Sequence, residues 1–550
     1  MAGQYGGQPI VIVDPSKERT KGRDALSMNI SAAQAVSDIV KTTLGPKGMD
    51  KMLVNQIGDI VLTNDGATIL KEMSIEHPTA KMVVEVARTQ ENVAGDGTTS
   101  AVVLTGALLE NARELIDTGV HPTMIVNGYR LAAEKAVLLV NDFAVSVTAD
   151  DKDILNKIAK TSITGKAIEA YGDLLSSICV DAVLAIRGNG AINIDDNILI
   201  TQDSGSKIND TELVEGVVLN KWRLHPNMPK RIENANIALI DTPIELGKTF
   251  NKSKVQIQSA DEMTAFVEQE ESYFKTMVDA IVQSGANVVF CSKGIDDHAV
   301  HYLQKNNIYA TRRVKDNEMQ NISRATGARI IRNIHEIEAS DLGSAGLVEQ
   351  EGESEMGKTY IKECTNAKSV TIIVRGSTDH VTDNIERSID DALHVVKNVI
   401  EDEKIVSGGG APEIEVALGL RSYAASVGGR EQMAISAFAD ALEAIPKALA
   451  ENAGHDTIDT ILNLRASHSN MKNAGLNVFT GEIENMLENG VVDPLKVKTQ
   501  AIKSASEAAT MVLRVDDVLR AQRKDMQDVK PEHNIHNYDG MSAPFLENRR

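Results

Sequence analysis

The chain has 550 residues, of which 42% are hydrophobic, 25% are charged and only 3% are aromatic. This length exceeds what one compact core supports, so we expect three or four domains with cores built mainly from aliphatic side chains. The formal net charge of −21 argues against a protein that binds nucleic acid, because such a surface repels phosphate backbones.

The start of the chain lacks the features that direct a protein to a membrane. Residues 1–7 do not have the basic and then apolar order of a signal peptide, and no apolar run reaches the roughly 18 residues that span a bilayer. The three cysteines, Cys179, Cys291 and Cys364, lie far apart without a CxxC pair, which argues against a zinc site or a disulfide framework. We therefore expect a soluble cytoplasmic protein with no membrane partner.

The N-terminal part has a helical pattern. Apolar residues recur at helical spacing over residues 26–43, and the predicted helix stops at Gly45-Pro46, a strong breaker. The loop that follows contains two glycines that free the backbone and the positive charge of Lys47, although a plain helix C-terminal turn explains it as well. The Asp-Gly pair at positions 65 and 66 is predicted to form a turn, for which a hairpin without chemistry is the simple explanation.

A second helix is predicted at about residues 81–93, and a third begins after a glycine-containing loop, GDGTTS at positions 95–100. Glycines let the backbone approach a ligand, and a helix N-terminus offers unpaired N–H groups and a positive dipole end that suit a phosphate. Three hydroxyl side chains add donors, and the carboxylate of Asp96 is the kind of oxygen ligand that Mg²⁺ prefers. The alternative is ordinary helix capping by Asp or Thr.

The middle of the chain changes to short β-rich runs, with helical segments between several of them, which predicts an α/β domain. These runs cover residues 198–201, 214–219, 237–240, 288–291 and 370–374. Helical spacing dominates again from about residue 377, over 378–399, 434–450 and 494–519. Composition leaves open whether three domains follow one another or the two helical ends fold together around an inserted middle. The polar tail from about residue 523 is predicted to be disordered.

Three further features of the sequence bear on a ligand site. Asp390 and Asp391 lie in a predicted helix, where neighbours point about 100° apart, so at most one faces a site, and a solvated helix face explains both. The run SGGG at positions 407–410 is flexible, and a linker explains it. Lys166 and Lys248 each follow a glycine but lack the first glycine of a P-loop, so a bound nucleotide would need a different cradle.

Taken together, these segments resemble the chaperonin family over nearly the full length of the chain. The runs that carry the resemblance are TLGPKGMD at 43–50, NDGATI at 64–69, GDGTT at 95–99, TSITGK at 161–166, DAL at 391–393 and SGGG at 407–410. Each run is weak alone, but their order along the chain makes the match specific. GMDK at 48–51 and EHP at 76–78 are similar to the group II branch, which holds the archaeal thermosomes and their eukaryotic cytosolic relatives.

The resemblance implies a multi-domain chaperonin fold with α and α/β parts. A helical equatorial domain would comprise residues 1–148 and 405–550, and a hinge-like intermediate domain would comprise residues 149–215 and 373–404. An α/β apical domain would take residues 216–372. Within it, residues 246–283 would form a helical protrusion that acts as a built-in lid; the alternative is an ordinary amphipathic surface helix.

The resemblance also implies a site for ATP or ADP with Mg²⁺. Asp96 would bind the metal, and Asp65 and Asp391 would align and activate the attacking water. Lys166 would sense the terminal phosphate, and Gly409 would contact the sugar. The residues expected to contact the nucleotide are Leu44, Gly45, Pro46, Gly97, Thr98, Thr99, Ser100, Ser162, Lys166, Gly409, Asn477, Val478, Asp493 and Lys498. Because Asp391 lies far from Asp96 in the sequence, we expect domain closure to complete the site.

The implied function is ATP-dependent protein folding by a subunit of a double ring. Its partners would be identical or paralogous subunits in stacked rings, together with unfolded client proteins that are enclosed under the lid. The alternatives are a catalytically silent scaffold with the same fold, a small-molecule kinase and a chaperonin with a detachable cap. Because all three acids are in place, we expect an active ATPase.

Overall fold

The structure of this chain is a computed structural model that describes residues 19–54, 58, 60–166, 168–188, 192–245, 260–352, 357–364 and 369–519. The chain divides into a small unit made from its two ends and a large unit, Asn29–Arg514. In the small unit, β1 (Arg19–Lys21) pairs antiparallel with β19 (Asp517–Leu519). All other sheets and the candidate site lie in the large unit.

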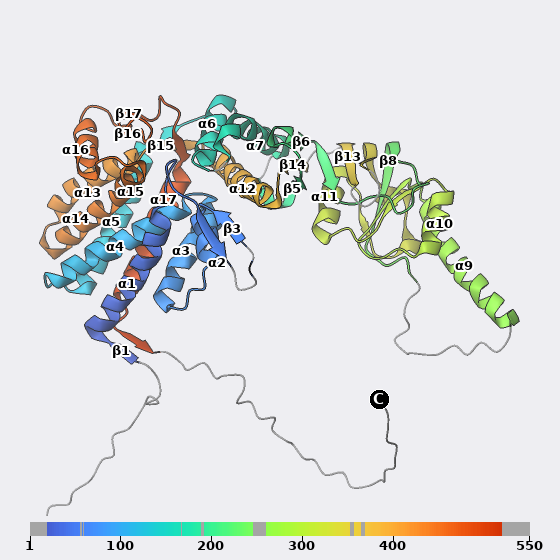
Figure 1. The fold of residues 1–550 in the computed structure, drawn as a ribbon, viewed down its shortest axis with the longest axis horizontal. Helices are drawn as coiled ribbons and strands as arrows, with labels where there is room; N and C mark the ends of the chain where they lie inside the picture. The colour runs from blue at the N-terminus through green and yellow to red at the C-terminus, as the bar shows by residue number, and fades with distance from the viewer. Residues whose placement is uncertain are drawn as a thin grey trace, which may run out of the picture. The chain divides into compact units, whose positions relative to one another are not determined.

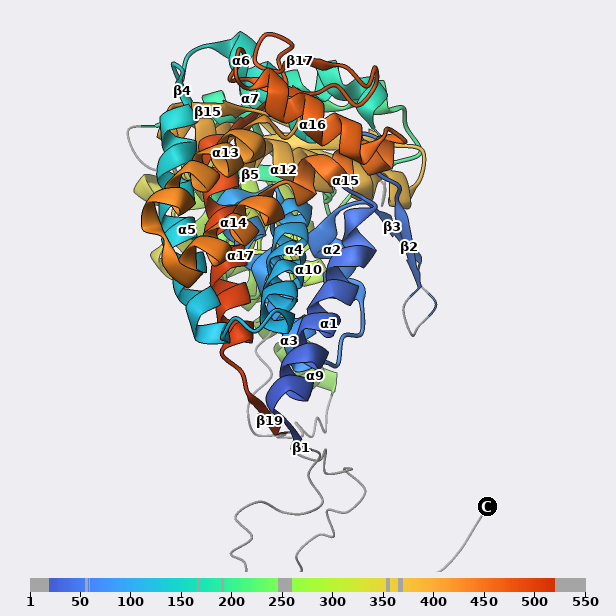
Figure 2. The same ribbon diagram turned by 90° about the vertical axis from the view of Figure 1, so that its left-hand side faces the viewer.

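A helical layer brings together segments from the first and last parts of the sequence (Figure 2). Its members are α1 (Gly22–Lys41), α2 (Gly66–Glu72), α3 (Pro78–Ala94), α4 (Thr98–Asp117), α5 (Pro122–Phe143), α13 (Ala411–Val427), α14 (Gly429–Leu442), α15 (Ala444–Ala453), α16 (Thr457–Ser467) and α17 (Leu495–Leu513). α14 and α17 both pack on α4 and α5. Between α5 and α14, the rings of Tyr129 and Phe438 meet edge to face at 5.5 Å, and the Tyr129 hydroxyl donates to the carbonyl of Leu108 at 2.7 Å. The two helical ends of the sequence therefore fold together, which excludes three domains in simple succession.

A second group of elements surrounds a three-stranded sheet. β14 (Val370–Gly376) lies between β5 (Ile198–Ser204), to which it is parallel, and β6 (Glu212–Val214), to which it is antiparallel. α6 (Lys152–Ile163), α7 (Gly172–Ile186) and α12 (Asp379–Asp402) pack together beside the sheet. They share an aliphatic core with the sheet that includes Leu155, Leu175, Ile372 and Ile389.

A seven-stranded mixed sheet forms a third region (Figure 1). Its order is β10 (Tyr309–Thr311), β9 (Val288–Cys291), β8 (Arg231–Ile240), β12 (Gly343–Glu351), β13 (Lys358–Cys364) and β7 (Gly216–Leu219), with β11 (Ile330–Ile331) beside β8. α9 (Ala260–Gln283) and α10 (Asp297–Lys305) share one core with the sheet, and α11 (Asp316–Thr326) shares another. Successive residues of β8 alternate between these cores, because neighbouring side chains on a strand point to opposite faces.

The remaining strands and one remaining α-helix are short. They are β2 (Lys51–Val54), β3 (Ile60–Thr63), β4 (Val145–Ser146), α8 (Ile194–Asn197), β15 (Lys404–Ser407), β16 (Ala474–Leu476), β17 (Ile483–Asn485) and β18 (Val492–Pro494). Of the helices that the structure describes, none is both long enough and apolar enough to cross a bilayer.

Several predicted elements differ from the structure. The predicted strand over residues 214–219 is two strands, β6 and β7, which belong to different sheets. The break falls before Gly216, whose φ of 139° and close approach to the carbonyl of Ile361 leave no room for a Cβ. The predicted helix at 434–450 is interrupted at Glu443, the predicted helix at 494–519 ends at Leu513, and the first helix begins at Gly22.

The predicted helical protrusion lies only partly within the described residues. Residues 246–259 lie outside them, as does the tail that was predicted to be disordered. The rest of the stretch is helical as α9, and its last turns bury Phe274, Met277, Val278 and Ile281 against the seven-stranded sheet. The C-terminal part of the predicted protrusion therefore belongs to a core, and the built-in lid stays a prediction.

Candidate functional site

A cavity of about 630 Å³ lies where the loops of the helical layer meet α6 and α12. Every residue that the sequence predicted for the nucleotide site lines this cavity. These residues are Leu44, Gly45, Pro46, Asp65, Asp96, Gly97, Thr98, Thr99, Ser100, Ser162, Lys166, Asp391, Gly409, Asn477, Val478, Asp493 and Lys498. The structure thus brings together side chains from both ends of the sequence.

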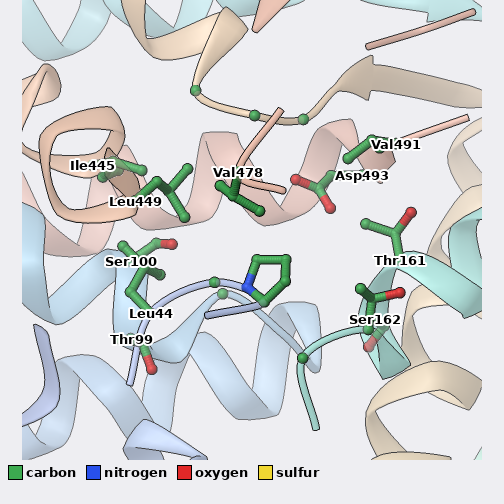
Figure 3. A pocket seen from close by; sticks show the side chains of 18 of the residues that line it. Leu44, Thr99, Ser100, Thr161, Ser162, Ile445, Leu449, Val478, Val491 and Asp493 are labelled. Atoms are coloured by element: carbon green, nitrogen blue, oxygen red, sulfur yellow. The ribbon is translucent and has the colours of Figure 1, made fainter. Parts of the chain in front are cut away.

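The cavity is lined by both apolar and polar side chains (Figure 3). Ile445 and Leu449 lie on the same side of the view as Ser100, Val478 lies next to Asp493, and Thr161 and Ser162 lie on the other side. The apolar surface of Ile445 and Leu449 suits a flat ring, and the hydroxyl and carboxylate groups suit the hydrogen-bonding parts of a ligand.

The loop before α4 needs its glycines. Gly95 ends α3 with a φ of 69°, and Gly97 precedes α4 with a φ of 77°, both in the left-handed region. A Cβ at Gly95 would lie 2.1 Å from Cβ of His394, and one at Gly97 would lie 2.6 Å from a methyl of Val497. The loop can therefore pass this close to α12 and α17 only because both residues lack a side chain.

The same loop is held in place by buried hydrogen bonds. The side-chain amide of Gln90, which is fully buried, donates to the carbonyls of Asp96 at 2.8 Å and Val497 at 3.1 Å. The Asp96 carboxylate accepts from the N–H of Gly97 at 2.5 Å. The N-terminus of α4 thus lies at the cavity, with Thr98, Thr99 and Ser100 in its first turn. A positive dipole end with three hydroxyl groups suits an anionic ligand.

Three loops meet at the cavity, before α2, after α6 and after α1. The side-chain amide of Asn64 donates to the carbonyl of Gly165 at 3.1 Å. A Cβ at Gly165 would lie 2.5 Å from the Cα of Pro46, so this glycine allows the loop after α6 to pack on the loop after α1. Asn452 fixes the latter loop, because its side-chain amide donates to the carbonyl of Leu44 at 2.8 Å.

Three acidic side chains and one lysine form the polar end of the cavity. Asp65 is the N-cap of α2, where it accepts from the N–H of Thr68 at 2.7 Å, and it also accepts from the Thr98 hydroxyl at 3.1 Å. The predicted Asp-Gly turn is thus a helix start rather than a hairpin. Asp391 extends from α12 and forms an ion pair with Lys166. Asp390, its neighbour, is half-exposed and does not line the cavity, so only one of the pair faces it.

Burial and mutual repulsion perturb these acids. Burial raises the pKa of Asp391 well above its ordinary value, and the nearby charges of Asp65 and Asp96 add to this effect, while Lys166 opposes it. Burial likewise raises the pKa of Asp96, with Asp493 adding and Lys166 opposing. Burial acts against the Lys166 ammonium, but Asp391 and Asp96 outweigh it and raise the pKa of Lys166. Three carboxylates around one ammonium leave an excess of negative charge, which attracts a cation.

The residues at this end fit a metal bound together with a phosphate. Within the described ranges, no three His, Cys, Asp or Glu side chains lie close enough to hold a metal ion by themselves. Mg²⁺ does not require such a cage, because it usually takes one or two carboxylates together with water and phosphate oxygens. The buried hydroxyl of Ser162 lines the cavity beside the Asp96 carboxylate and acts to lower the pKa of that carboxyl, so a donor and a carboxylate face the same part of the cavity.

The opposite end is built from loops near the C-terminus. Gly409, with a φ of 65°, accepts a hydrogen bond at its carbonyl from the N–H of Leu476 at 2.9 Å. The side-chain amide of Asn477 donates to Glu484 at 3.0 Å. Lys498 lies between two carboxylates, with its ammonium 3.0 Å from Asp493 and 3.0 Å from Glu413.

Sequence reasoning missed part of the lining. Some of the missed residues lie inside the runs that carry the resemblance but were not assigned to the site: Thr43, Asn64, Gly165, Gly408 and Gly410. Others carry no local signal, because they are ordinary apolar or polar residues of a helix or a hairpin: Ile445, Leu449, Phe479, Glu484 and Met486.

Comparisons with known proteins agree in pointing to one family. A profile of the TCP-1/cpn60 chaperonin family matches residues 36–523. The thermosome subunit of Methanothermococcus thermolithotrophicus is 52% identical over 518 residues, which cover 94% of this chain and 95% of the relative. The thermosome subunit beta of Archaeoglobus fulgidus is 51% identical over 520 residues, with the same coverage of both chains.

A solved structure adds to the same assignment. The open-state monomer of a group II chaperonin from Methanococcoides burtonii matches with a TM-score of 0.59 and 46% identity, and the match covers 76% of this chain and all of that one. This chain therefore belongs to the TCP-1/cpn60 chaperonin family, in its group II branch.

Proposed function

We propose that this chain hydrolyses ATP in the cavity and uses the reaction to close over unfolded proteins. Membership of the family makes the chain a subunit of an ATP-dependent, double-ring molecular chaperone. The observation that carries the finer proposal is the convergence of Asp65, Asp96, Lys166 and Asp391 on one cavity. The other end of the cavity is apolar enough to bind a nucleotide base.

The phosphate end would work by charge neutralisation and positioning, which phosphoryl transfer chiefly needs. Asp96 would hold Mg²⁺, which supplies neutralisation of the phosphate charge when bound. The N–H groups and hydroxyls at the start of α4, from Thr98 to Ser100, would hold phosphate oxygens, and the hydroxyl of Ser162 would add a donor.

Asp65 and Asp391 would orient a water molecule and accept its proton. A raised pKa suits Asp391 for this role, because a general base works best when its pKa approaches the working pH. Asp391 forms an ion pair with Lys166. A terminal phosphate would offer Lys166 a competing anion, and the release of Asp391 would then couple nucleotide binding to base activation.

The other end would receive the base and the sugar. Leu44, Gly45 and Pro46 would cover the nucleotide from one side, and Gly409 would contact the sugar. Asn477, Val478, Asp493 and Lys498 would lie near the base or the ribose. The aliphatic side chains of Ile445 and Leu449 support this placement, because they offer a flat ring an apolar surface.

The site would couple chemistry to motion through α12. Asp391 belongs to the proposed intermediate domain, 149–215 and 373–404, whereas Asp96 belongs to the proposed equatorial domain, 1–148 and 405–550. ATP would favour the closed arrangement because only that arrangement completes the site. The proposed apical domain, 216–372, would then move with its lid, 246–283, and identical or paralogous neighbours in the ring would make the change cooperative.

The decisive experiment compares Asp391→Asn with Asp390→Asn. We expect Asp391→Asn to lower ATP turnover by ~10²–10⁴-fold, the usual contribution of a general base, while the chain still binds ATP. Asp390→Asn changes a half-exposed neighbour on the same helix and serves as the matched control. Phosphate release and equilibrium binding are measured on assembled protein, whose rings are verified by electron microscopy.

Two outcomes would contradict the proposal. If Asp391→Asn hydrolyses ATP at the wild-type rate, Asp391 is not the base. If the wild-type rings bind ATP without hydrolysing it, the chain is a silent scaffold with the chaperonin fold.

A further inference from the structure

A buried ion-pair network of three side chains lies at the sugar end of the cavity. It consists of Glu413 in the first turn of α13, Asp493 in β18 and Lys498 in the first turn of α17. The Lys498 ammonium lies 3.0 Å from a carboxylate oxygen of each acid. The side chain of Glu413 is 5% exposed and that of Lys498 is 13% exposed, whereas Asp493 is 24% exposed. The network therefore presents its Asp493 end to the cavity.

The charges of the network do not cancel. Two carboxylates share one ammonium, so a formal charge of −1 remains in a largely buried place. Burial acts against the Lys498 ammonium, but Glu413 and Asp493 outweigh it and raise the pKa of Lys498. Lys498 is thus fixed as a cation, and two of its three N–H donors point to the two acids.

Glu413 makes fewer interactions than a buried carboxylate usually does. Its second oxygen, Oε2, is buried and has no hydrogen-bond partner among the described residues. A buried acceptor without a partner costs free energy, and such a group is typical of a functional site rather than of a stabilising one. Its place in the first turn of α13 offsets part of the cost, because a helix N-terminus favours negative charge.

Asp493 is the member that can reach a ligand. It lines the cavity, and Figure 3 shows its carboxylate directed into the open space beside Val478. If Asp493 were the only partner of Lys498, the ammonium would donate more of its hydrogen bonds to the Asp493 carboxylate. It would then compete with a ligand hydroxyl for the lone pairs of the Asp493 oxygens. Because Glu413 shares the ammonium, Asp493 keeps its capacity as an acceptor.

We propose that Glu413 is a positioning residue that, through Lys498, holds Asp493 ready to accept a hydrogen bond from a sugar hydroxyl of the nucleotide. This inference rests on the proposed function, since it needs a nucleotide in the cavity. It assigns Glu413 a role in ligand discrimination although Glu413 does not line the cavity itself.

The test measures the binding of ADP and of its 2′-deoxy and 3′-deoxy analogues with Mg²⁺, so that hydrolysis does not interfere. The wild-type chain should bind ADP about 10-fold more tightly than at least one deoxy analogue, as a hydrogen bond to a charged group predicts. In Glu413→Gln that preference should fall to about 2-fold or less, through a loss of ADP affinity and not through a gain for the analogue. Glu413→Asp, which keeps the charge on a shorter side chain, should give an intermediate preference and covers the case in which Glu413→Gln does not fold.

The matched control is Glu415→Gln, two residues along the same helix. Glu415 pairs with His468 at 3.0 Å and does not line the cavity, so its replacement should leave the preference unchanged. Equal losses of affinity for ADP and for both deoxy analogues in Glu413→Gln would show a merely structural role and would overturn the inference. So would a wild-type chain that binds all three ligands equally well. A wild-type chain that binds none of them would overturn the proposed function together with the inference.

Discussion

The cavity and the seven-stranded sheet are stabilised in opposite ways. In the sheet, β9 is wholly buried and apolar, and ion pairs such as Arg231–Glu233 lie at exposed positions. In the cavity, charged side chains are themselves largely buried: Lys166 is 17% exposed and Asp391 is 23% exposed. Burying aliphatic groups stabilises a fold, whereas burying an excess of like charge destabilises it. The sheet is therefore built for stability, and the cavity keeps a costly arrangement that makes sense only for binding and chemistry.

The sharpest way to break this comparison is Asp96→Asn. We expect Mg²⁺ affinity in the presence of nucleotide to fall by more than about 100-fold, since even groups behind a metal ligand contribute 10–100-fold. We expect no loss of thermal stability, because burial raises the pKa of Asp96 and the ionised side chain therefore costs folding free energy at neutral pH. Metal titration of nucleotide binding and a thermal melt check both parts. A melt at clearly lower temperature would mean that Asp96 is structural.

Phe274→Ala in α9 is expected to do the reverse of Asp96→Asn, because it should lower stability and leave ligand binding unchanged. Phe274 is 1% exposed in the core that α9 shares with the sheet. Its truncation should destabilise that region by about 3–5 kcal/mol, the usual cost of removing a buried phenyl ring, and should leave nucleotide binding intact. Hydrogen exchange of the β8 and β9 amides reports the loss, and Lys275→Ala, at a neighbouring exposed position, is the control. Unchanged exchange in Phe274→Ala would contradict the assigned core.

A smaller effect is expected from pH. Hydrolysis needs ionised Asp391, whose pKa is raised by burial and by Asp65 and Asp96, so turnover should fall in acid at a pH above the ordinary aspartate value of about 4. Lys166→Met should move this midpoint further upward, because Lys166 opposes the rise. The effect of pH on stability runs the other way from its effect on turnover. The contribution of Asp391 to the free energy of unfolding is fully present below its pKa in the unfolded chain, and it is lost as pH rises through its raised pKa in the folded chain. A pH–rate profile with the midpoint of an ordinary, exposed aspartate would contradict this account.

The sequence predicts much of the site because its residues occur in short runs that have a physical logic. Glycines beside Asp96, hydroxyls at a helix start and a glycine triplet each favour a phosphate or a close backbone approach, and family resemblance joins them into one site. A local sequence pattern does not show which residues lie close together in the folded chain. Nothing around Ile445 or Leu449 predicts that α15 borders the cavity, since apolar helical spacing is the same at a ligand as in a core.

The fold shows the same limit. Periodicity predicts the helices and most strands, but it cannot show that a β-rich run crosses from one sheet to another at Gly216. The end of α17 at Leu513 is a similar case, because the residues that follow pair with β1 from the start of the chain. Long-range pairing overrides local propensity at both places.

The central claim is that Asp65, Asp96 and Asp391 meet around one metal-bound triphosphate. The most direct test is a structure of the assembled protein with ADP, Mg²⁺ and an unreactive mimic of the terminal phosphate. The account predicts that the metal contacts Asp96 and that Asp65 and Asp391 lie within hydrogen-bond reach of a water beside the mimic. A nucleotide bound elsewhere, or bound in this cavity with Asp391 turned away from it, would contradict the account.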